Sequence, residues 1–72
     1  MTNQEKMRML EEIFELDENY LTEDSVLKDI VEYDSMAKLS LIVLCDDEFD
    51  KKLTGEQIRE FETVRDILNF LN

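Results

Sequence analysis

The chain has 72 residues and a formal net charge of −11, from 8 basic and 19 acidic side chains. This length allows one small domain, so residues 1–72 are expected to form a single domain. The negative charge disfavours nucleic acid and anionic membranes as partners and favours proteins with basic patches. One cysteine and no histidine leave no internal disulfide and no zinc site, so helix packing is expected to stabilise the fold.

Targeting segments and catalysis are both disfavoured by the sequence. No stretch has the length of a transmembrane helix, and residues 1–5 lack the basic-then-apolar order of a signal peptide. We therefore expect a cytoplasmic protein with no membrane span, and a monomer. The lack of histidine removes the most common general base, and a chain this short has little room to enclose a substrate, so we do not expect an enzyme.

The first predicted helix runs from about Asn3 to Leu16, capped by Thr2 or Asn3. Its apolar side chains recur every three or four residues, at Met7, Leu10, Ile13 and Phe14. The acidic residues Glu11, Glu12 and Glu15 lie off this apolar face. A long connection from about 17 to 34 follows, and loops of this length are often functional. Its apolar residues are expected to fold onto the core; they are Tyr20, Leu21, Val26, Leu27 and Ile30.

The second predicted helix begins at Asp34 or Ser35, since either residue can cap a helix. Its apolar run extends from Met36 to Phe49. The stretch 41–45 would also suit a buried strand, but a segment of about 15 residues without flanking turn residues favours a helix. A helix that is apolar on most sides is expected to be central and covered by several neighbours.

A short third helix is predicted near 56–61, entered through Thr54 and Gly55. The fourth begins at Thr63, where Asp66 takes the place of the usual Glu or Gln of a capping box. An apolar stripe then continues to the C-terminus through Val64, Ile67, Leu68 and Leu71. These patterns predict an all-α bundle of three main helices and one short helix, with a long first loop.

The segment Asp34-Ser35-Met36 starts the second helix, which runs through an apolar stretch to Asp46-Asp47-Glu48 and Phe49. This pattern resembles the acyl and peptidyl carrier protein family, whose fold is a bundle of three main helices and one short helix. The segments 22–30 and 63–67 also resemble that family, so nearly the whole chain is covered. A specialised subgroup with an aromatic residue before Asp-Ser is the most similar, because Tyr33 precedes Asp34.

The resemblance implies that Ser35 receives 4'-phosphopantetheine from coenzyme A through a separate phosphopantetheinyl transferase. The terminal thiol of this arm then carries acyl or aminoacyl groups as thioesters. By the same resemblance, Asp34 helps the transferase place its metal and coenzyme A, and Met36 lies at the mouth of the cargo cavity or contacts a partner. The physical setting agrees, because the positive end of a helix dipole suits a phosphodiester. The alternative for Asp34-Ser35 is a helix cap and nothing more.

Candidate docking residues lie near the start of the second helix and at its C-terminal end: Lys38, Leu39, Asp46, Asp47 and Glu48. Acidic residues at a helix C-terminus oppose the dipole, which favours a role in binding partner enzymes, while a solvated acidic face is the alternative. The implied partners are acyl-activating and acyl-transferring enzymes with basic docking patches. Lys38 and Ser40 depart from the acidic residues usual in fatty-acid carriers, which favours a specialised pathway over general fatty acid synthesis.

Other features are less informative. Cys45 is expected to be a buried small hydrophobe, and Met7, Met9 and Met36 are expected to fill the core. A calcium loop starting at Asp46 fails, because Lys51 stands where glycine is needed and Gln57 where glutamate is needed. The competing function is an acidic helical interaction module without a prosthetic group.

Overall fold

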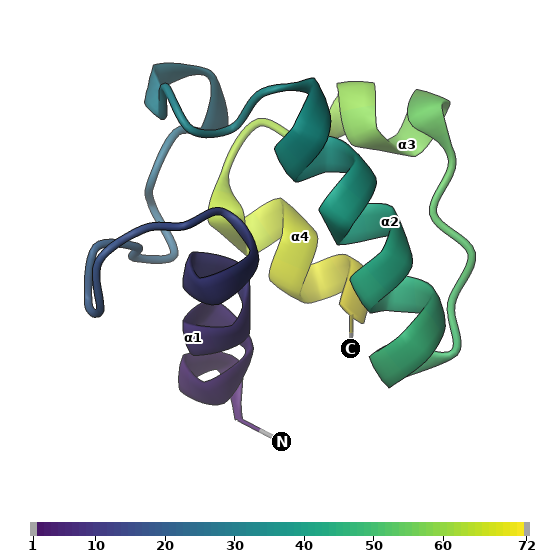
Figure 1. The fold of residues 1–72 in the computed structure, drawn as a ribbon, viewed down its shortest axis with the longest axis horizontal. Coiled ribbons are helices and arrows are strands. Elements are labelled where there is room, and N and C mark those ends of the chain that lie inside the picture. Colours follow the sequence, from purple (N-terminus) through teal and green to yellow (C-terminus); the bar gives the residue numbers. More distant parts are fainter. Residues whose placement is uncertain (1, 72) are drawn as a thin grey trace.

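The computed structural model describes residues 2–71. Over this range the chain forms α1 (Asn3–Ile13), a short 3-10 helix η1 (Leu27–Asp29), α2 (Ser35–Phe49), α3 (Gly55–Glu60) and α4 (Val64–Leu71). The all-α bundle with a short helix and a long first loop, predicted from the sequence, is confirmed (Figure 1). No helix of the described residues is long and apolar enough to cross a membrane.

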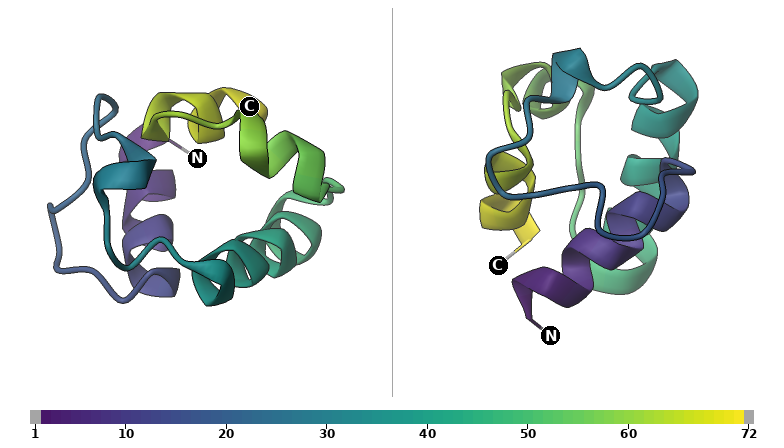
Figure 2. Two further views of the ribbon diagram at one scale, coloured as in Figure 1. Left: turned by 90° about the horizontal axis from the view of Figure 1, so that it is seen from above. Right: turned by 90° about the vertical axis from the view of Figure 1, so that its left-hand side faces the viewer.

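The helices surround a core to which the first loop also contributes (Figure 2). α1 packs against both α2 and α4. The largest fully buried side chains come from all three of these helices and from η1; they are Leu10, Leu27, Leu41, Ile67, Leu68, Val64 and Cys45. Burial of apolar surface between helices is thus the main stabilising term.

α1 ends at Ile13, three residues before the predicted end at Leu16. Glu15 has a φ of 59°, in the left-handed region. The N–H of Leu16 donates to the Glu11 carbonyl at 2.8 Å, and that of Glu15 donates to the Glu12 carbonyl at 3.2 Å. These two bonds are those of a Schellman motif, which closes the helix and satisfies its last carbonyls without a glycine.

Three of the five apolar loop residues are buried as predicted, namely Leu21, Leu27 and Ile30. The prediction was wrong for Tyr20, which is 51% exposed and follows a turn in which its N–H donates to the Asp17 carbonyl. The loop is held to the start of α4 by an isolated bridge between Val26 and Thr63. The N–H of Leu27 donates to the Glu62 carbonyl at 2.9 Å within this contact.

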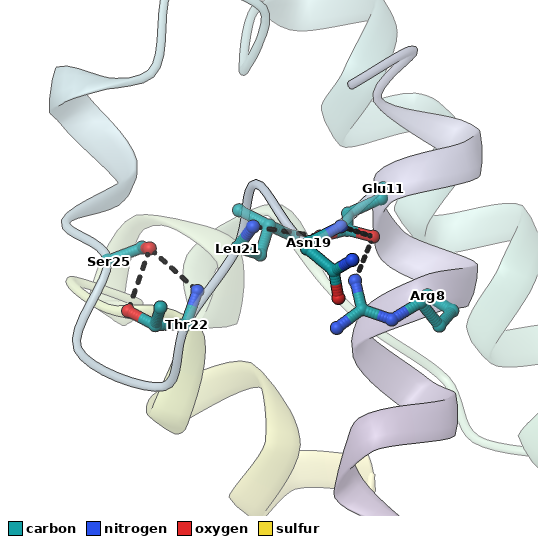
Figure 3. Close-up of polar contacts among 6 residues, drawn as sticks. All are labelled: Arg8, Glu11, Asn19, Leu21, Thr22 and Ser25. Atoms are coloured by element: carbon teal, nitrogen blue, oxygen red, sulfur yellow. Dashed lines mark hydrogen bonds and ion pairs between the residues drawn. The ribbon is translucent and has the colours of Figure 1, made fainter. Parts of the chain in front are cut away.

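A buried carboxylate fastens the same loop to α1 (Figure 3). The Oε1 atom of Glu11 accepts hydrogen bonds from Arg8 and from the N–H of Asn19, and Oε2 accepts from the N–H of Leu21 at 2.8 Å. Although Glu11 lies off the apolar face of the helical pattern, its side chain is only 2% exposed, because the first loop covers it. Its burial is tolerated because its oxygens are hydrogen-bonded.

α2 is a helix throughout 41–45, so the alternative of a strand is excluded. Its buried residues are Ala37, Leu41 and Cys45, which recur every four positions and form one stripe. The opposite side is open: Leu39 is 56% exposed and Val43 52% exposed. The prediction of a central helix covered by several neighbours was therefore wrong, and Figure 2 shows α2 at the edge of the bundle.

Local capping signals agree with the remaining boundaries. Thr54 caps α3 in a capping box with Gln57, so the helix begins at Gly55, one residue before the prediction. At α4 the carboxylate of Asp66 accepts from the N–H groups of Glu62 and Thr63, at 2.9 and 3.1 Å. The predicted role of Asp66 is thus confirmed for one of the two hydrogen bonds of a capping box, the one that its carboxylate accepts from the N–H of Thr63.

Candidate functional site

Asp34 and Ser35 have separate tasks at the start of α2. Asp34 is the N-cap, and its Oδ1 accepts a hydrogen bond from the N–H of Ala37 at 3.0 Å. Ser35 is the first helical residue and is exposed. Because the cap is supplied by Asp34, the hydroxyl of Ser35 is not needed for capping. An exposed hydroxyl beside the unpaired N–H groups of a helix start can accept a phosphate-linked group.

A groove of about 420 Å³ begins at Ser35 and runs between α2 and α3. Its floor is apolar, and a basic residue from each helix lines it. The lining residues are Ser35, Lys38, Leu39, Ile42, Gly55, Ile58 and Arg59. Figure 1 shows α3 beside the first turns of α2. Three of the residues singled out from the sequence are thus brought together here, namely Ser35, Lys38 and Leu39.

Met36 lies outside this groove. It is 72% exposed and, with Asp34 and Ala37, lines a second hollow between the start of α2 and the end of α1. Its prediction as a core filler was wrong, because the second residue of α2 falls on the uncovered side of the helix. The exposure leaves Met36 accessible to a partner protein, and Asp34, Ser35 and Met36 all remain at one end of the bundle.

Lys38 lies next to a pair of packed aromatic rings. The Tyr33 ring packs edge-on against Phe14, with centroids 5.3 Å apart, and the Nζ of Lys38 lies 5.5 Å from the centroid of the Tyr33 ring. A cation over an aromatic face is attracted to it without losing its charge. Burial raises the pKa of Tyr33 to about 12. Among the described residues, its buried hydroxyl has no hydrogen-bond partner.

The acidic end of α2 divides into two parts. Asp47 and Glu48 line a hollow of about 400 Å³ with Leu39 and Val43. Asp46 lines a different hollow with Ile42 and Val43. All three carboxylates are exposed. α2 therefore presents apolar and acidic side chains together on its uncovered side, a combination suited to a protein partner that is apolar and basic.

Cys45 is fully buried, as predicted, and burial raises the pKa of its thiol. A raised pKa leaves little of the thiolate that a nucleophile requires. Within residues 2–71, no group of three or more His, Cys, Asp or Glu side chains could hold a metal ion.

Sequence reasoning missed Arg59. In the sequence Arg59 looks like any basic residue of a short helix, and only the placement of α3 relative to α2 brings it to the groove of Ser35. No local signal in the sequence marks Arg59, because it becomes relevant only by lining the same groove as Ser35, which lies 24 positions earlier in the chain.

Curated proteins similar to this chain include two named acyl carrier protein, from the ZS7 and B31 strains of Borreliella burgdorferi. Each is 35% identical to this chain over 54 residues, which make up 75% of this chain and 68% of the relative. No protein-family model matches the chain. No solved structure matches it.

Proposed function

Because the chain belongs to the acyl carrier protein family, we propose that it carries acyl or aminoacyl groups as thioesters on a 4'-phosphopantetheine arm attached to Ser35. Members of this family are carriers and not catalysts, so partner enzymes perform the reactions. The arm supplies a terminal thiol to which the cargo is bound. The chain supplies the hydroxyl, the helix start that favours a phosphate, and the surface that partners recognise.

The observation that carries the proposal is the exposure of Ser35 at the first position of α2, with Asp34 acting as the cap. The residues present fit the group, since a groove lined by two cations begins at this hydroxyl. Attachment forms a bond between Ser35 Oγ and the pantetheine-side phosphorus of coenzyme A. The pyrophosphate linkage breaks, adenosine bisphosphate leaves, and the hydroxyl proton passes to the transferase.

The uncovered side of α2 supports a role in docking. Lys38 and Leu39 near Ser35, and Asp46, Asp47 and Glu48 further along, are the residues proposed to contact the transferase and the acyl-transferring enzymes. Lys38 places a positive charge on this otherwise acidic helix, so partners built for it differ from those of a uniformly acidic carrier. A fatty-acid-like or specialised pathway in the cytoplasm, served by a monomeric carrier, is the setting we propose.

Incubation with coenzyme A and a phosphopantetheinyl transferase of broad specificity tests the proposal. The intact mass is expected to rise by one phosphopantetheine unit, and Ser35→Ala is expected to abolish the rise. Ser40→Ala, on the same helix, is the matched control and should be modified like the wild type. An unchanged mass with a transferase that modifies another carrier would contradict the proposal and favour an interaction module without a prosthetic group.

A further inference from the structure

The groove at Ser35 contains two cations in a strongly acidic protein. Lys38 comes from α2, one turn after Ser35, and Arg59 comes from α3 on the facing side. The chain has only 8 basic residues and a net charge of −11. Two of these few positive charges therefore line the hollow in which the serine hydroxyl lies.

Neither cation is neutralised by a carboxylate within the part of the chain that the structure describes. Arg8 forms an ion pair with Glu11, and Arg65 forms ion pairs with Glu23 and Asp24. No such pair involves Lys38 or Arg59. The contact of Lys38 with the Tyr33 ring orients its ammonium group and leaves the charge in place. Both charges are thus available to an anion in the groove.

We propose that Lys38 and Arg59 bind the phosphodiester of the arm and hold its root in the groove between α2 and α3. This inference rests on the proposed function, because the phosphate is present only after Ser35 is modified. A phosphodiester joined to the Ser35 oxygen lies at the end of the groove that these cations line. The surrounding acidic protein repels an added negative charge, and two nearby cations offset that repulsion.

Phosphorus-31 NMR of the modified protein tests this directly. Wild type, Lys38→Gln, Arg59→Gln and the double variant are modified, and their intact masses are checked before the spectra are recorded. The phosphodiester resonance is expected to shift in each single variant and to shift furthest in the double variant. Raising the salt to 1 M, where screening acts within about 3 Å, should move the wild-type resonance toward that of the double variant.

Lys28→Gln is the matched control. Lys28 is an exposed lysine of η1 outside the groove, so its loss changes the net charge equally without touching the site. The resonance in this variant should equal that of the wild type. Identical resonances in all five proteins would overturn the inference, and so would a shift in Lys28→Gln as large as that in the double variant.

Loading the arm with neutral and anionic cargo shows whether the two cations bind the phosphate of the arm or a carboxylate of the cargo. Side-chain nitrogen NMR signals of Lys38 and Arg59 are compared in unmodified, modified, butyryl-loaded and succinyl-loaded protein. A change on modification alone supports the inference. A change that appears only with the succinyl carboxylate would assign the cations to the cargo and overturn it. The intact masses separate a failure of the proposed function from a failure of this inference. If Ser35 is not modified, both are contradicted. If Ser35 is modified but the signals of Lys38 and Arg59 do not change, only this inference is contradicted.

Discussion

At the scale of single residues, Glu11 is a polar group that joins the first loop to α1. It is a buried carboxylate that accepts hydrogen bonds from Arg8 and from two loop N–H groups, those of Asn19 and Leu21. Both partners on the loop are backbone N–H groups, and that of the buried Leu21 would otherwise lack an acceptor. One side chain therefore helps to set the position of a segment ten residues further along the chain.

Glu11→Gln is expected to lower the free energy of unfolding by about 1–3 kcal/mol. The amide keeps one acceptor oxygen but turns an NH₂ group toward an N–H donor, which leaves a buried donor unpaired. Urea unfolding measures the change. Glu12→Gln is the control, because Glu12 is exposed next to it, and a change within about 0.5 kcal/mol is expected there. Equal effects of the two substitutions would contradict the role of Glu11.

Tyr33→Phe should raise the free energy of unfolding by about 1 kcal/mol, because the Tyr33 hydroxyl is buried without a hydrogen-bond partner among the described residues. The ring contact with Phe14 and the cation over the ring are retained. Tyr20→Phe, which alters a half-exposed tyrosine, should leave the stability nearly unchanged. A clear loss of stability in Tyr33→Phe would mean that the hydroxyl has a partner.

At the scale of elements, α2 has two sides with different tasks. One side is the buried stripe of Ala37, Leu41 and Cys45, which holds the helix to the core. The other exposes Leu39 and Val43 next to the acidic residues at the end of the helix. The stripe secures the position of Ser35, and the exposed side is left for partners.

Leu41→Ala is expected to lower the free energy of unfolding by about 2–5 kcal/mol, because it removes a fully buried side chain and leaves a cavity. Leu39→Ala is the same substitution two positions away at a site 56% exposed, and it should change stability by less than about 0.5 kcal/mol. Thermal unfolding compares the two variants.

Under the proposed docking role, Leu39→Ala should weaken binding to the transferase, measured as a higher KM of the transferase for the carrier.

At the scale of the whole molecule, the response to acid follows from three carboxylates. A hydrogen bond from the N–H of Thr2 lowers the pKa of Glu5, and those from Glu62 and Thr63 lower the pKa of Asp66. For Glu11, burial by itself raises the pKa, but the hydrogen bonds from Arg8, Leu21 and Asn19 outweigh it and the pKa is lowered. Each group binds a proton less readily in the folded state than in the unfolded chain.

The stabilisation from these groups is therefore complete above their usual pKa values of 4.5 for Glu and 3.8 for Asp, and it is lost as the pH falls through the lowered values. Urea unfolding between pH 7 and pH 2.5 at constant salt should show stability falling below about pH 4.5. Glu11→Gln should flatten this decline, and Glu12→Gln should not. A stability that keeps rising down to pH 2.5 would contradict the assignment.

The sequence by itself determined where the helices lie and where Ser35 stands among them. Caps such as Thr54 with Gln57, and the apolar stripe from Val64 to Leu71, act within one or two turns, so the local pattern is sufficient. The same is true of Asp34 and Ser35 at the start of α2. The predicted end of the first helix at Leu16 was wrong, because Glu15 adopts a left-handed backbone conformation and ends α1 without the glycine that usually marks such an end.

Only the tertiary structure decided which side of α2 is covered, that Glu11 is buried, and that Arg59 lies in the groove of Ser35. Each of these depends on contact between segments far apart in the sequence. Burial depends on the residues that pack against a side chain. A helix that is apolar on most sides does not reveal from its own sequence which side the other helices will cover. The surroundings of the serine hydroxyl were therefore set by packing, and its position by the local sequence.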